Sequence, residues 1–345
     1  MTDALRLERL KLTLERPHES ARGGVVARRA LGLTVSGPRG SGAAEVAPLD
    51  GFSCETLEEA FEALRKLETL GNSLDVALDE ISGVLPNGPP SARFALQAAL
   101  LDGVGRSEGL PAARLLGASS DALRSVALLD SLDAALSQAE TAAESGAPGV
   151  KLKIGRPGRA EEEGAILRAI RKIYGVSFLI RADANGSLGD ARHPLLEVLA
   201  EIGADYVEEP FPVERLLGGE VPACPVALDE SVARAPAACL EVVARGRAAA
   251  LVIKPTLHGV SRALELGREA RRRGGRAVVG HLFEPPRAFA ALVHVALALD
   301  AAEVHGLSCY PGLESWRSVE GGGSLPVPAF LRGSAADVSA TRGLG

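Results

Sequence analysis

The 345-residue sequence has no long apolar run. None approaches the roughly 20 residues that a membrane span needs, and no charged start with a following apolar stretch appears after Met1. Basic residues are not in excess either, because the formal net charge is −6 and the isoelectric point lies near 5.7. A nucleic acid or an anionic membrane would require a basic face, so neither is an expected partner. These absences predict a cytoplasmic protein.

Cysteines are few and scattered, at Cys54, Cys224, Cys239 and Cys309, with no CxxC pair and no accompanying histidine cluster. This spacing indicates neither a zinc site nor a disulfide framework. We expect all four to be reduced structural thiols.

Lysine is also scarce. Six of the 38 basic residues are lysines, namely Lys11, Lys66, Lys151, Lys153, Lys172 and Lys254. Arginine stays protonated in proteins, whereas a buried lysine can give and take a proton. Three of the six lysines lie in the short motifs described below, where proton exchange is therefore expected.

A length of 345 residues with 46% hydrophobic content exceeds one average domain, which predicts two domains. Residues 1–118 are expected to form an α+β domain. Its expected strands are Ala4–Leu14, Gly24–Ser36 and Ala44–Val46, with a loop containing Pro17 and His18 between the first two. Its expected helices are Leu57–Leu70, which begins with a Thr56/Glu59 capping box, Ser91–Asp102 and Pro111–Leu116.

From Arg124 onward strand and helix patterns alternate, which predicts an α/β fold: a TIM-like (β/α)7β barrel over residues 119–320. The eight expected strands are Ser125–Leu129, Val150–Ile154, Phe178–Ala182, Tyr206–Glu208, Val226–Leu228, Ala250–Ile253, Ala277–Gly280 and Glu303–Leu307. The seven expected helices are Leu132–Glu144, Ala160–Tyr174, Pro194–Gly203, Glu214–Leu217, Ala235–Arg245, Val260–Arg273 and Arg287–Leu299. The tail, about residues 321–345, is expected to be irregular and to join the first domain.

Charged residues end five of these strands, in the motifs KLKIG (151–155), RADAN (181–185), YVEEP (206–210), ALDES (227–231) and VIKP (252–255). The charged positions 153, 183, 208, 229 and 254 follow one another at intervals of 30, 25, 21 and 25 residues. One strand, one helix and their loops take about 31 residues in such a barrel. Because catalytic residues of this fold come from the C-terminal ends of several strands, the motifs are expected to converge at one mouth.

Asp183, Glu208 and Asp229 are three carboxylates at three successive strand ends. Packed together without a counterion they would repel one another, and a hard divalent cation removes that cost. With no histidine or cysteine nearby, these oxygen ligands favour Mg²⁺ over zinc, with Mn²⁺ as a substitute. Taken one at a time, each could instead be a helix cap or a solvated loop charge.

Lys153 and Lys254 would flank this metal from opposite sides, since the second and sixth strands lie across a barrel from each other. A nearby cation and partial burial both lower the pKa of an ammonium group. One of the lysines is therefore prepared to remove a proton α to a carboxylate, and the metal can hold the charge of the enediolate that results. Two surface lysines paired with nearby acids are the alternative.

The ordered motifs KLK (151–153), DAN (183–185), VEEP (207–210), LDES (228–231) and IKP (253–255) resemble the enolase superfamily, in its muconate-lactonising subgroup. The likeness covers nearly the whole chain and implies that the first domain is a capping domain whose loops close over the barrel mouth. It also implies a lysine base beside Mg²⁺. By position it implies metal ligands Asp183, Glu208 and Asp229, an acid/base pair Lys153 and Lys254, a supporting cation Lys151, and Asn185 and Glu230 near the metal. Glu208 rather than Glu209 is the expected ligand, because neighbours on a strand point to opposite faces.

Within the subgroup the chain resembles the o-succinylbenzoate synthases of menaquinone biosynthesis, in the stretches GAAEVAPLDGFSCET (42–56), SARFALQAALLD (91–102) and GHLFEPP (280–286). These lyases dehydrate a succinyl-hydroxycyclohexadiene carboxylate. The resemblance implies that Lys153 removes the α proton and then protonates the departing hydroxyl, while Lys254 stabilises the enediolate. The implied partner is a small carboxylate, and the sequence is compatible with a homo-oligomer.

The expected substrate pocket departs from the pattern of many relatives. The seventh strand ends in HLFE (281–284) rather than in small polar residues, and His281 and Glu284 are expected to bind or support the substrate, with a structural role as the alternative for His281. The eighth strand ends in GLSC (306–309), without the Asp-x-Asp that dipeptide epimerases use for a substrate ammonium. Arg28 and Arg29 could meet the succinyl carboxylate, but surface positions are the favoured interpretation.

An N-acylamino acid racemase, or another cycloisomerase or epimerase of the subgroup, is an alternative, because the same two lysines on opposite faces would serve it. A non-catalytic metal-binding scaffold is a third. The presence of both lysines together with three carboxylates argues against the scaffold, which has no use for that pair.

Overall fold

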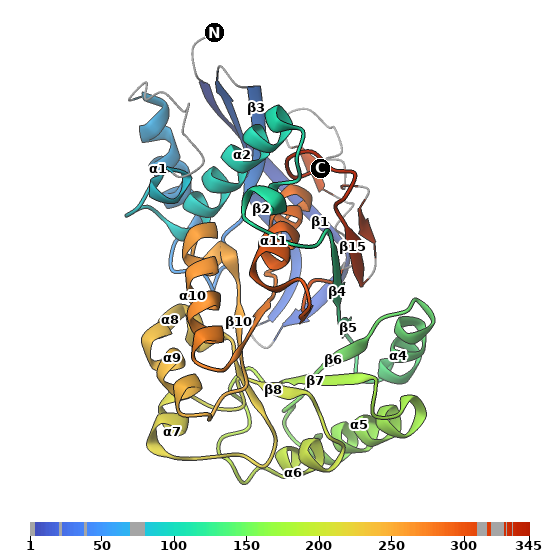
Figure 1. Ribbon diagram of the computed structural model, residues 1–345. Coiled ribbons are helices and arrows are strands. Elements are labelled where there is room, and N and C mark those ends of the chain that lie inside the picture. The colour runs from blue at the N-terminus through green and yellow to red at the C-terminus, as the bar shows by residue number, and fades with distance from the viewer. Residues whose placement is uncertain are drawn as a thin grey trace.

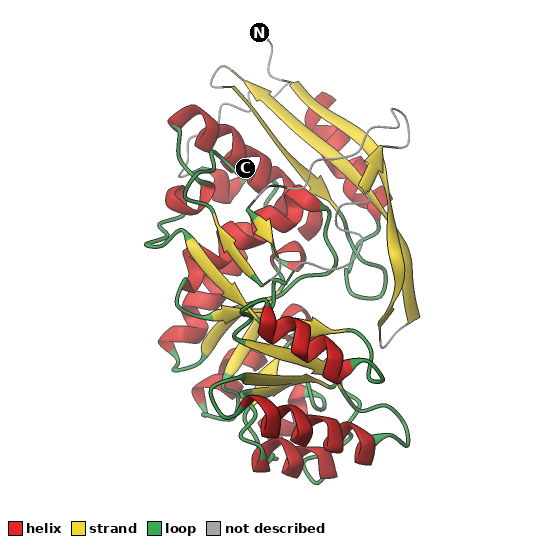
Figure 2. Ribbon diagram, turned by 90° about the vertical axis from the view of Figure 1, so that its right-hand side faces the viewer, coloured by secondary structure: helices red, strands yellow, loops and turns green. Residues whose placement is uncertain are grey.

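A computed structural model describes residues 4–20, 23–37, 40–69, 80–308, 316–318, 328, 330–332 and 334–345. An antiparallel sheet built from the N-terminal strands lies beside a curled parallel sheet with helices on its outer side (Figures 1 and 2). The helix α2 (Pro90–Glu108) contacts both parts, because the Gln97 amide donates to the Ser261 hydroxyl at 3.1 Å.

The N-terminal sheet contains β1 (Ala4–Ser20), β2 (Gly23–Gly37) and β3 (Gly40–Val46), with β13 (Trp316–Ser318) beside β1. All neighbouring strands in it are antiparallel. The predicted loop around Pro17 and His18 is wrong, because β1 continues to Ser20 and β2 begins at Gly23. The pairing accommodates the proline through a register shift between Thr13 and His18, since an irregular position does not need its missing N–H.

The helices α1 (Leu57–Thr69), α2 and α3 (Ala112–Leu115) follow these strands as predicted, and the 3-10 turn η1 (Ile81–Gly83) was not predicted. The predicted capping box begins α1. The Glu59 N–H donates to Thr56 Oγ1 at 3.2 Å, and the Thr56 N–H donates to Glu59 Oε2 at 2.7 Å. The helix α2 lies directly on β3, where a Cβ on Gly42 would meet the Ala99 carbonyl oxygen at 2.0 Å. This close approach requires glycine.

The second sheet is parallel, with seven strands in the order β11-β10-β9-β8-β7-β6-β5. They are β5 (Ala127–Leu129), β6 (Gly149–Lys153), β7 (Leu179–Asp183), β8 (Tyr206–Glu208), β9 (Val226–Leu228), β10 (Ala250–Ile253) and β11 (Arg276–Val279). An eighth strand, β12 (Val304–His305), joins β11 through a bridge between Gly280 and Gly306 and pairs with β4 (Ala122–Ser125). This confirms the predicted (β/α)7β barrel, although the predicted first strand is divided at Val126.

The barrel helices cover the outside of this sheet (Figure 1). They are α4 (Ala135–Glu144), α5 (Ala160–Tyr174), α6 (Pro194–Glu201), α7 (Val213–Gly218), α8 (Glu230–Arg234), α9 (Pro236–Ala244), the 3-10 turn η2 (Pro255–Leu257), α10 (Val260–Arg272) and α11 (Pro286–Asp300). Every residue of β8, β9 and β10 is buried, as expected for parallel strands covered on both faces. A small cluster fills the barrel interior: Tyr206, Ala227, Ala250, Val252 and Val278.

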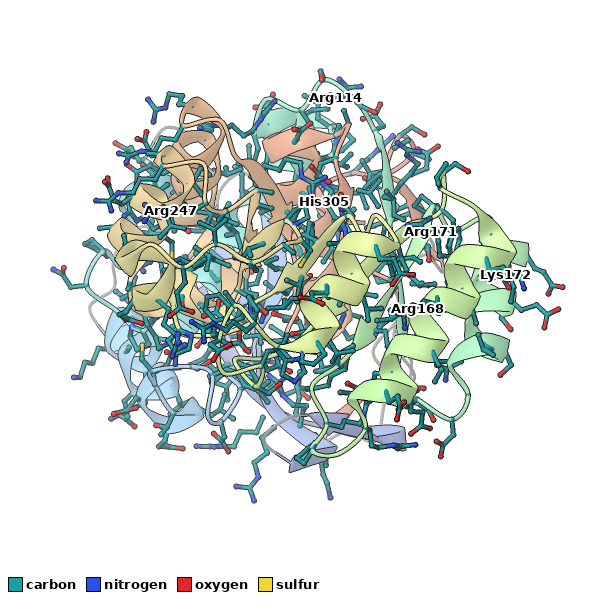
Figure 3. All side chains as sticks on the ribbon, turned by 90° about the horizontal axis from the view of Figure 1, so that it is seen from below. Arg114, Arg168, Arg171, Lys172, Arg247 and His305 are labelled. Carbon is teal, nitrogen blue, oxygen red and sulfur yellow. The ribbon has the colours of Figure 1, made fainter. Side chains whose placement is uncertain are left out.

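A buried charged group closes the end of the barrel at which the strands begin. Arg181 is 1% exposed and donates to Asp205 at 2.7 Å, to Glu303 at 3.1 Å and to the Val304 carbonyl at 2.7 Å. In the view from below, the neighbouring His305 lies near the middle of the molecule, whereas Lys172 on α5 lies at its edge (Figure 3). The open end is therefore the opposite one, where the strands finish.

The described C-terminal residues run back over both parts of the molecule. The strand β15 (Ala335–Asp337) pairs antiparallel with β4, and β14 (Leu331–Arg332) pairs with β15. Farther on, the Leu344 N–H donates to Asp102 of α2 at 2.8 Å. Residues 321–327 of the predicted tail lie outside the described residues.

The described cysteines carry free thiols, of which Cys224 and Cys239 are buried and Cys54 is exposed. Cys309 lies outside the described residues. Across the described part of the chain, no helix combines the length and the apolar character needed to cross a bilayer.

Candidate active site

The charged motifs meet at the C-terminal ends of neighbouring strands. Lys153 on β6 is in register with Asp183 on β7, which is in register with Glu208 on β8. Asp229 and Lys254 directly follow β9 and β10. Because adjacent strands are about 4.8 Å apart, these side chains share one mouth, as the sequence predicted.

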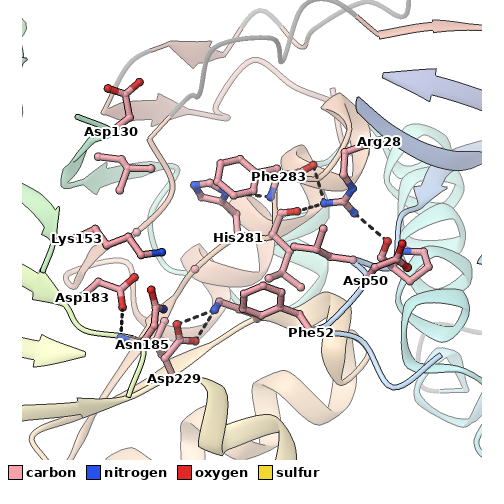
Figure 4. Close-up of a pocket in the computed structure, with 18 of the residues that line it drawn as sticks. Arg28, Asp50, Phe52, Asp130, Lys153, Asp183, Asn185, Asp229, His281 and Phe283 are labelled. Atoms are coloured by element: carbon pink, nitrogen blue, oxygen red, sulfur yellow. Dashed lines mark hydrogen bonds and ion pairs between the residues drawn. The ribbon is translucent and has the colours of Figure 1, made fainter. Parts of the chain in front are cut away.

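A cavity of about 840 Å³ opens at this mouth (Figure 4). The barrel contributes the predicted site residues Lys151, Lys153, Asp183, Asn185, Asp229, Lys254 and His281 to its lining. The first domain contributes Arg9, Arg28 and Arg29 from its strands and Pro48, Leu49, Asp50 and Phe52 from the loop after β3. The N-terminal domain thus covers the mouth, which is the arrangement implied by the family resemblance.

Two of the three carboxylates are buried and held by lysines. The Lys151 ammonium donates to Glu208 at 2.8 Å, and the Lys254 ammonium lies 2.6 Å from Asp229. Asp183 is more open, with its carboxylate 3.9 Å from Lys151. Burial raises the pKa of both Glu208 and Asp229, and the charge of Asp183 raises the pKa of each further, against the lowering effect of the lysines. The carboxylates therefore repel one another as predicted.

The predicted three-ligand metal cluster is not closed in this structure. Within the described ranges, no three acidic, histidine or cysteine side chains approach closely enough to hold an ion. Glu208 pairs with Lys151 and Asp229 pairs with Lys254. The donors themselves suit a hard divalent cation, because they are carboxylate oxygens with mutual repulsion. Two further buried oxygens nearby, Asn185 Oδ1 and Glu230 Oε2, lack a hydrogen-bond partner among the described residues.

Glu208 and its neighbour Glu209 have different partners. Glu208 receives Lys151, whereas Glu209 accepts from the Asp229 N–H at 2.8 Å and from the Ser231 hydroxyl. Glu209 therefore holds the end of β9, and Glu208 belongs to the charged group. This separation agrees with the choice of Glu208 made from the sequence.

The two predicted acid/base lysines have unequal surroundings. Within the described part of the chain, the Lys153 ammonium has no hydrogen-bond or ion-pair partner, and burial lowers its pKa. Burial also acts to lower the pKa of Lys254, but Asp229 and Glu230 raise it above the ordinary value. The Lys254 ammonium lies 5.5 Å from the centre of the Phe52 ring. Burial thus lowers the pKa of Lys153, as expected, whereas at Lys254 the neighbouring carboxylates outweigh the effect of burial.

Lys151 is a fixed cation in this arrangement. Burial alone would lower its pKa, but Glu208 and Asp183 raise it well above the ordinary value. Its ammonium contacts the Glu208 and Asp183 carboxylates, and the supporting role implied by the resemblance stays a prediction.

Asn185 and Glu230 form a bonded pair beside Asp183. The Asn185 amide donates to Glu230 at 2.8 Å, and the Asn185 N–H donates to Asp183 at 3.2 Å. Asn185 has a φ of 44°, a left-handed conformation that asparagine tolerates better than most residues. The pair is thus close to the carboxylates, as predicted.

The loop after β11 places its two predicted residues differently. His281 lines the cavity, and its ring lies 5.0 Å from that of Phe283. Glu284 is fully buried outside the cavity lining, where it accepts from the Leu282 N–H at 2.6 Å and from the Thr256 hydroxyl at 2.7 Å. Burial raises its pKa. Glu284 was expected to bind or to support the substrate. Its position suits support of the loop rather than contact with a ligand.

Sequence reasoning misjudged two residues from the first domain. Arg28 was expected on the surface but is 4% exposed and donates to backbone carbonyls of both domains. Phe52 was not predicted to line the site, although it lies within residues 42–56, which resemble the synthases. An isolated arginine on a strand or an isolated aromatic in a loop carries no local signal, because its partners are far away in the sequence.

Comparison with known proteins identifies similar chains. A family model described as "Enolase C-terminal domain-like" matches residues 134–345. An o-succinylbenzoate synthase of Thermosynechococcus vestitus is 29% identical over 314 residues, which is 88% of this chain and 91% of that protein. An N-succinylamino acid racemase of an Amycolatopsis species is 30% identical over 264 residues, which is 72% of this chain and 70% of that protein.

Solved structures share the whole architecture. A dipeptide epimerase from Methylococcus capsulatus, complexed with Mg and the dipeptide L-Arg-D-Lys, has a TM-score of 0.78 at 26% identity and covers 100% of this chain and 99% of its own. A muconate lactonizing enzyme from Pseudomonas fluorescens has a TM-score of 0.82 at 22% identity and covers 100% of this chain and 96% of its own. The second likeness shows the fold.

Proposed function

We propose that this chain, which belongs to the enolase superfamily, dehydrates 2-succinyl-6-hydroxy-2,4-cyclohexadiene-1-carboxylate to o-succinylbenzoate, as a carbon–oxygen lyase of menaquinone biosynthesis. The observation that carries the proposal is the asymmetry of the two lysines across the mouth. Lys153 is unpaired within the described residues and has a lowered pKa, whereas Lys254 is held by Asp229. The likeness to the T. vestitus synthase supports it, because it extends over 88% of the chain.

Lys153 is the proposed base and then the proposed acid. Its neutral amine takes the proton from the ring carbon that bears the carboxylate, and the electron pair moves into the carboxylate. When that pair returns, the bond from the neighbouring ring carbon to its hydroxyl breaks. Lys153 gives its proton to the departing oxygen, so that water leaves and the ring becomes aromatic. A lowered pKa favours the neutral amine that the first step needs.

Lys254 is proposed to remain a cation during these steps. Its ammonium reaches the same cavity as Lys153, where its charge would stabilise the negative carboxylate oxygens of the intermediate. Asn185 is proposed to orient Glu230 beside this region, and His281 to contact the substrate.

Asp183, Glu208 and Asp229 are the proposed ligands of a Mg²⁺ ion, with Mn²⁺ as a substitute. A bound divalent cation would supply positive charge next to the substrate carboxylate. It would compete with Lys151 for Glu208 and with Lys254 for Asp229. Support comes from the oxygen-only donor set and from the Mg bound by the M. capsulatus epimerase.

The second candidate is racemisation of N-succinylamino acids, which the 30% identical Amycolatopsis racemase favours. Racemisation needs proton exchange on both faces of the α carbon, so both lysines would have to lose a proton in turn. Dehydration needs one lysine that does so. Lys153 is the lysine with a lowered pKa, and the likeness to the T. vestitus synthase covers 88% of the chain, so the synthase is the first candidate.

A direct assay separates these functions. The purified protein with Mg²⁺ is incubated with the cyclohexadiene precursor, and formation of the aromatic product is followed by ultraviolet absorbance. In parallel, N-succinylamino acids are incubated in D₂O, and deuterium at the α carbon is measured by mass spectrometry. Aromatisation without α deuteration supports the synthase, and the reverse result supports the racemase. No change in either, with Mg²⁺ bound, would leave the metal-binding scaffold as the remaining function.

A further inference from the structure

Two segments from different domains form one wall of the cavity. Residues 47–52 follow β3 in the first domain, and residues 281–284 follow β11 in the barrel. Arg28 on β2 lies between them, and dashed lines join it to both (Figure 4). We infer that Arg28 is a positioning residue that sets the separation of these two segments and thereby substrate affinity. The inference rests on the proposed function in that this cavity is taken as the substrate pocket.

The contacts of Arg28 divide between the two segments. One terminal nitrogen donates to the Leu282 carbonyl and, at 3.3 Å, to the Phe283 carbonyl. The other donates to the Ala47 carbonyl at 2.5 Å and to the Pro48 carbonyl at 3.2 Å. A guanidinium presents several donors in a rigid planar fork, whereas a lysine ammonium is a compact point charge. A lysine at this position would therefore not donate hydrogen bonds to the carbonyls of both segments at once.

The barrel segment needs an external constraint. Phe283 has a φ of 55°, a left-handed conformation that is costly for a bulky residue and persists when its surroundings enforce it. Glu284 holds one side of this segment through the Leu282 N–H and Thr256. Arg28 holds the other side through the Leu282 and Phe283 carbonyls. The segment is thus fixed between a residue of its own domain and a residue of the neighbouring domain.

Both segments carry side chains that border the reacting groups. Phe52, at the end of the first, places its ring 5.5 Å from the Lys254 ammonium. His281, at the start of the second, lines the cavity beside Phe283. Figure 4 shows Phe52 and His281 on the same side of the cavity, opposite Lys153. A change in the separation of the segments would move these side chains relative to a bound substrate while the lysines stay in place on the barrel.

Arg93 provides a matched control. It also links the two domains through backbone carbonyls, since it donates to Pro86 at 2.7 Å and to His258 at 2.8 Å. It does not line the catalytic cavity but a second one between α2 and α10. Arg93→Lys therefore weakens a domain contact of the same chemical type outside the lining of the catalytic cavity.

The first test does not depend on turnover. Hydrogen–deuterium exchange of the full chain is compared between wild type, Arg28→Lys and Arg93→Lys, because amide exchange reports local opening. Arg28→Lys is expected to speed exchange in peptides that contain residues 47–52 and 281–284 by about tenfold, with the barrel strands unchanged. Unchanged exchange in both peptides, or an equal increase throughout the chain, would overturn the inference.

The second test measures the kinetic consequence. Arg28→Lys is expected to raise KM for the precursor about tenfold and to change kcat less than about twofold, because the lysines stay in place. Arg93→Lys is expected to leave KM unchanged. Equal KM values for wild type and Arg28→Lys would reject the positioning role. If wild type does not convert the precursor, the proposed function fails, and the exchange experiment alone decides the role of Arg28.

Discussion

Two lysines with the same chemistry acquire different roles here from their immediate neighbours. Lys254 has Asp229 within 2.6 Å, while Lys153 has no hydrogen-bond or ion-pair partner in the described part of the chain. The pKa of the first is raised by that carboxylate, and the pKa of the second is lowered by burial. At the scale of single residues, these contacts support the proposed assignment of Lys153 as the base and Lys254 as the cation.

Replacement of Lys153 by arginine tests the proposed base. Lys153→Arg keeps a positive charge but cannot lose a proton, so we expect kcat for the precursor to fall by about 10³-fold or more. The far-ultraviolet circular dichroism should remain that of the wild type. Lys172→Arg, an exposed change of the same kind on α5, is the control and should keep full activity. Activity of Lys153→Arg near that of the control would exclude Lys153 as the base.

Replacement of Asp183 tests the proposed metal site. Asp183 is the carboxylate least engaged by lysine, since its distance from Lys151 is 3.9 Å. We expect Asp183→Asn to weaken Mg²⁺ binding at least about tenfold, measured by isothermal titration calorimetry, because a charged oxygen ligand is lost. Asp133→Asn, whose side chain is 82% exposed, serves as the control. Equal Mg²⁺ affinity in the two variants would remove Asp183 from the metal site.

At the scale of elements, one charged side chain of the first domain, Glu45, meets the start of a barrel helix. The helix α11 begins directly after the pocket segment 281–284, and Glu45 of β3 accepts from its Ala288 N–H at 2.7 Å. A carboxylate is favourable at a helix N-terminus, yet burial raises the pKa of Glu45 from 4.5 to about 7. The cost of burying the charge therefore exceeds the benefit of the helix end, the Ala288 N–H and Arg287.

This shift predicts how stability changes with pH. Between pH 4.5 and about 7 the unfolded chain has an ionised Glu45, while the folded chain keeps the proton, so rising pH favours unfolding. The resulting decrease in the free energy of unfolding is complete above pH 7 and amounts to about 3 kcal/mol for a pKa shift of this size. Glu45→Gln removes this ionisation. The free energy of unfolding of Glu45→Gln, relative to that of wild type, should therefore increase by about 3 kcal/mol from pH 4.5 to pH 8.

The measurement is urea unfolding of both proteins at several pH values. An exposed change, Glu161→Gln, is the control and should alter the unfolding free energy by less than about 0.5 kcal/mol throughout. A constant difference between Glu45→Gln and wild type across this pH range would contradict the assignment of a raised pKa to Glu45.

At the scale of the whole molecule, the barrel is closed by long-range polar contacts as well as by strand pairing. Arg181 on β7 reaches the Val304 carbonyl of β12 on the far side of the interior, and Asp205 and Glu303 neutralise it. Its guanidinium also lies 4.5 Å from the centre of the Tyr206 ring. These groups connect β7, in the middle of the parallel sheet, with β12, the last strand of the barrel.

Removal of this side chain should destabilise the barrel. We expect Arg181→Ala to lower the free energy of unfolding by about 3–5 kcal/mol, because Asp205 and Glu303 lose the more deeply buried of their two arginine partners, of which Arg276 is the other. Arg168→Ala on α5 removes an exposed ion pair with Glu201 and should cost less than about 1 kcal/mol. The free energies of unfolding of the two variants are measured by thermal unfolding and by chemical denaturation. Similar losses in the two variants would show that the buried group contributes no more than a surface ion pair.

Much of the architecture follows from local patterns. The alternation of strand and helix predicted the eight barrel strands and their order of charged ends, and the capping box at Thr56 predicted the start of α1. The loop predicted around Pro17 was wrong, because pairing in a long hairpin depends on a partner strand rather than on the apolar pattern of its own residues. The first barrel strand is divided at Val126, and its two parts have different partners: β4 pairs with β12 and β15, whereas β5 pairs with β6.

The sequence by itself determined which chemical groups reach the mouth, because the position of a residue at the end of a parallel strand follows from the barrel repeat. This is true of Lys153, Asp183 and Lys254. Tertiary structure decided how those groups are paired and which residues of the other domain surround them. Arg28 and Phe52 belong to this second class, since a contact over more than 200 residues arises from domain packing and leaves no pattern in either local sequence.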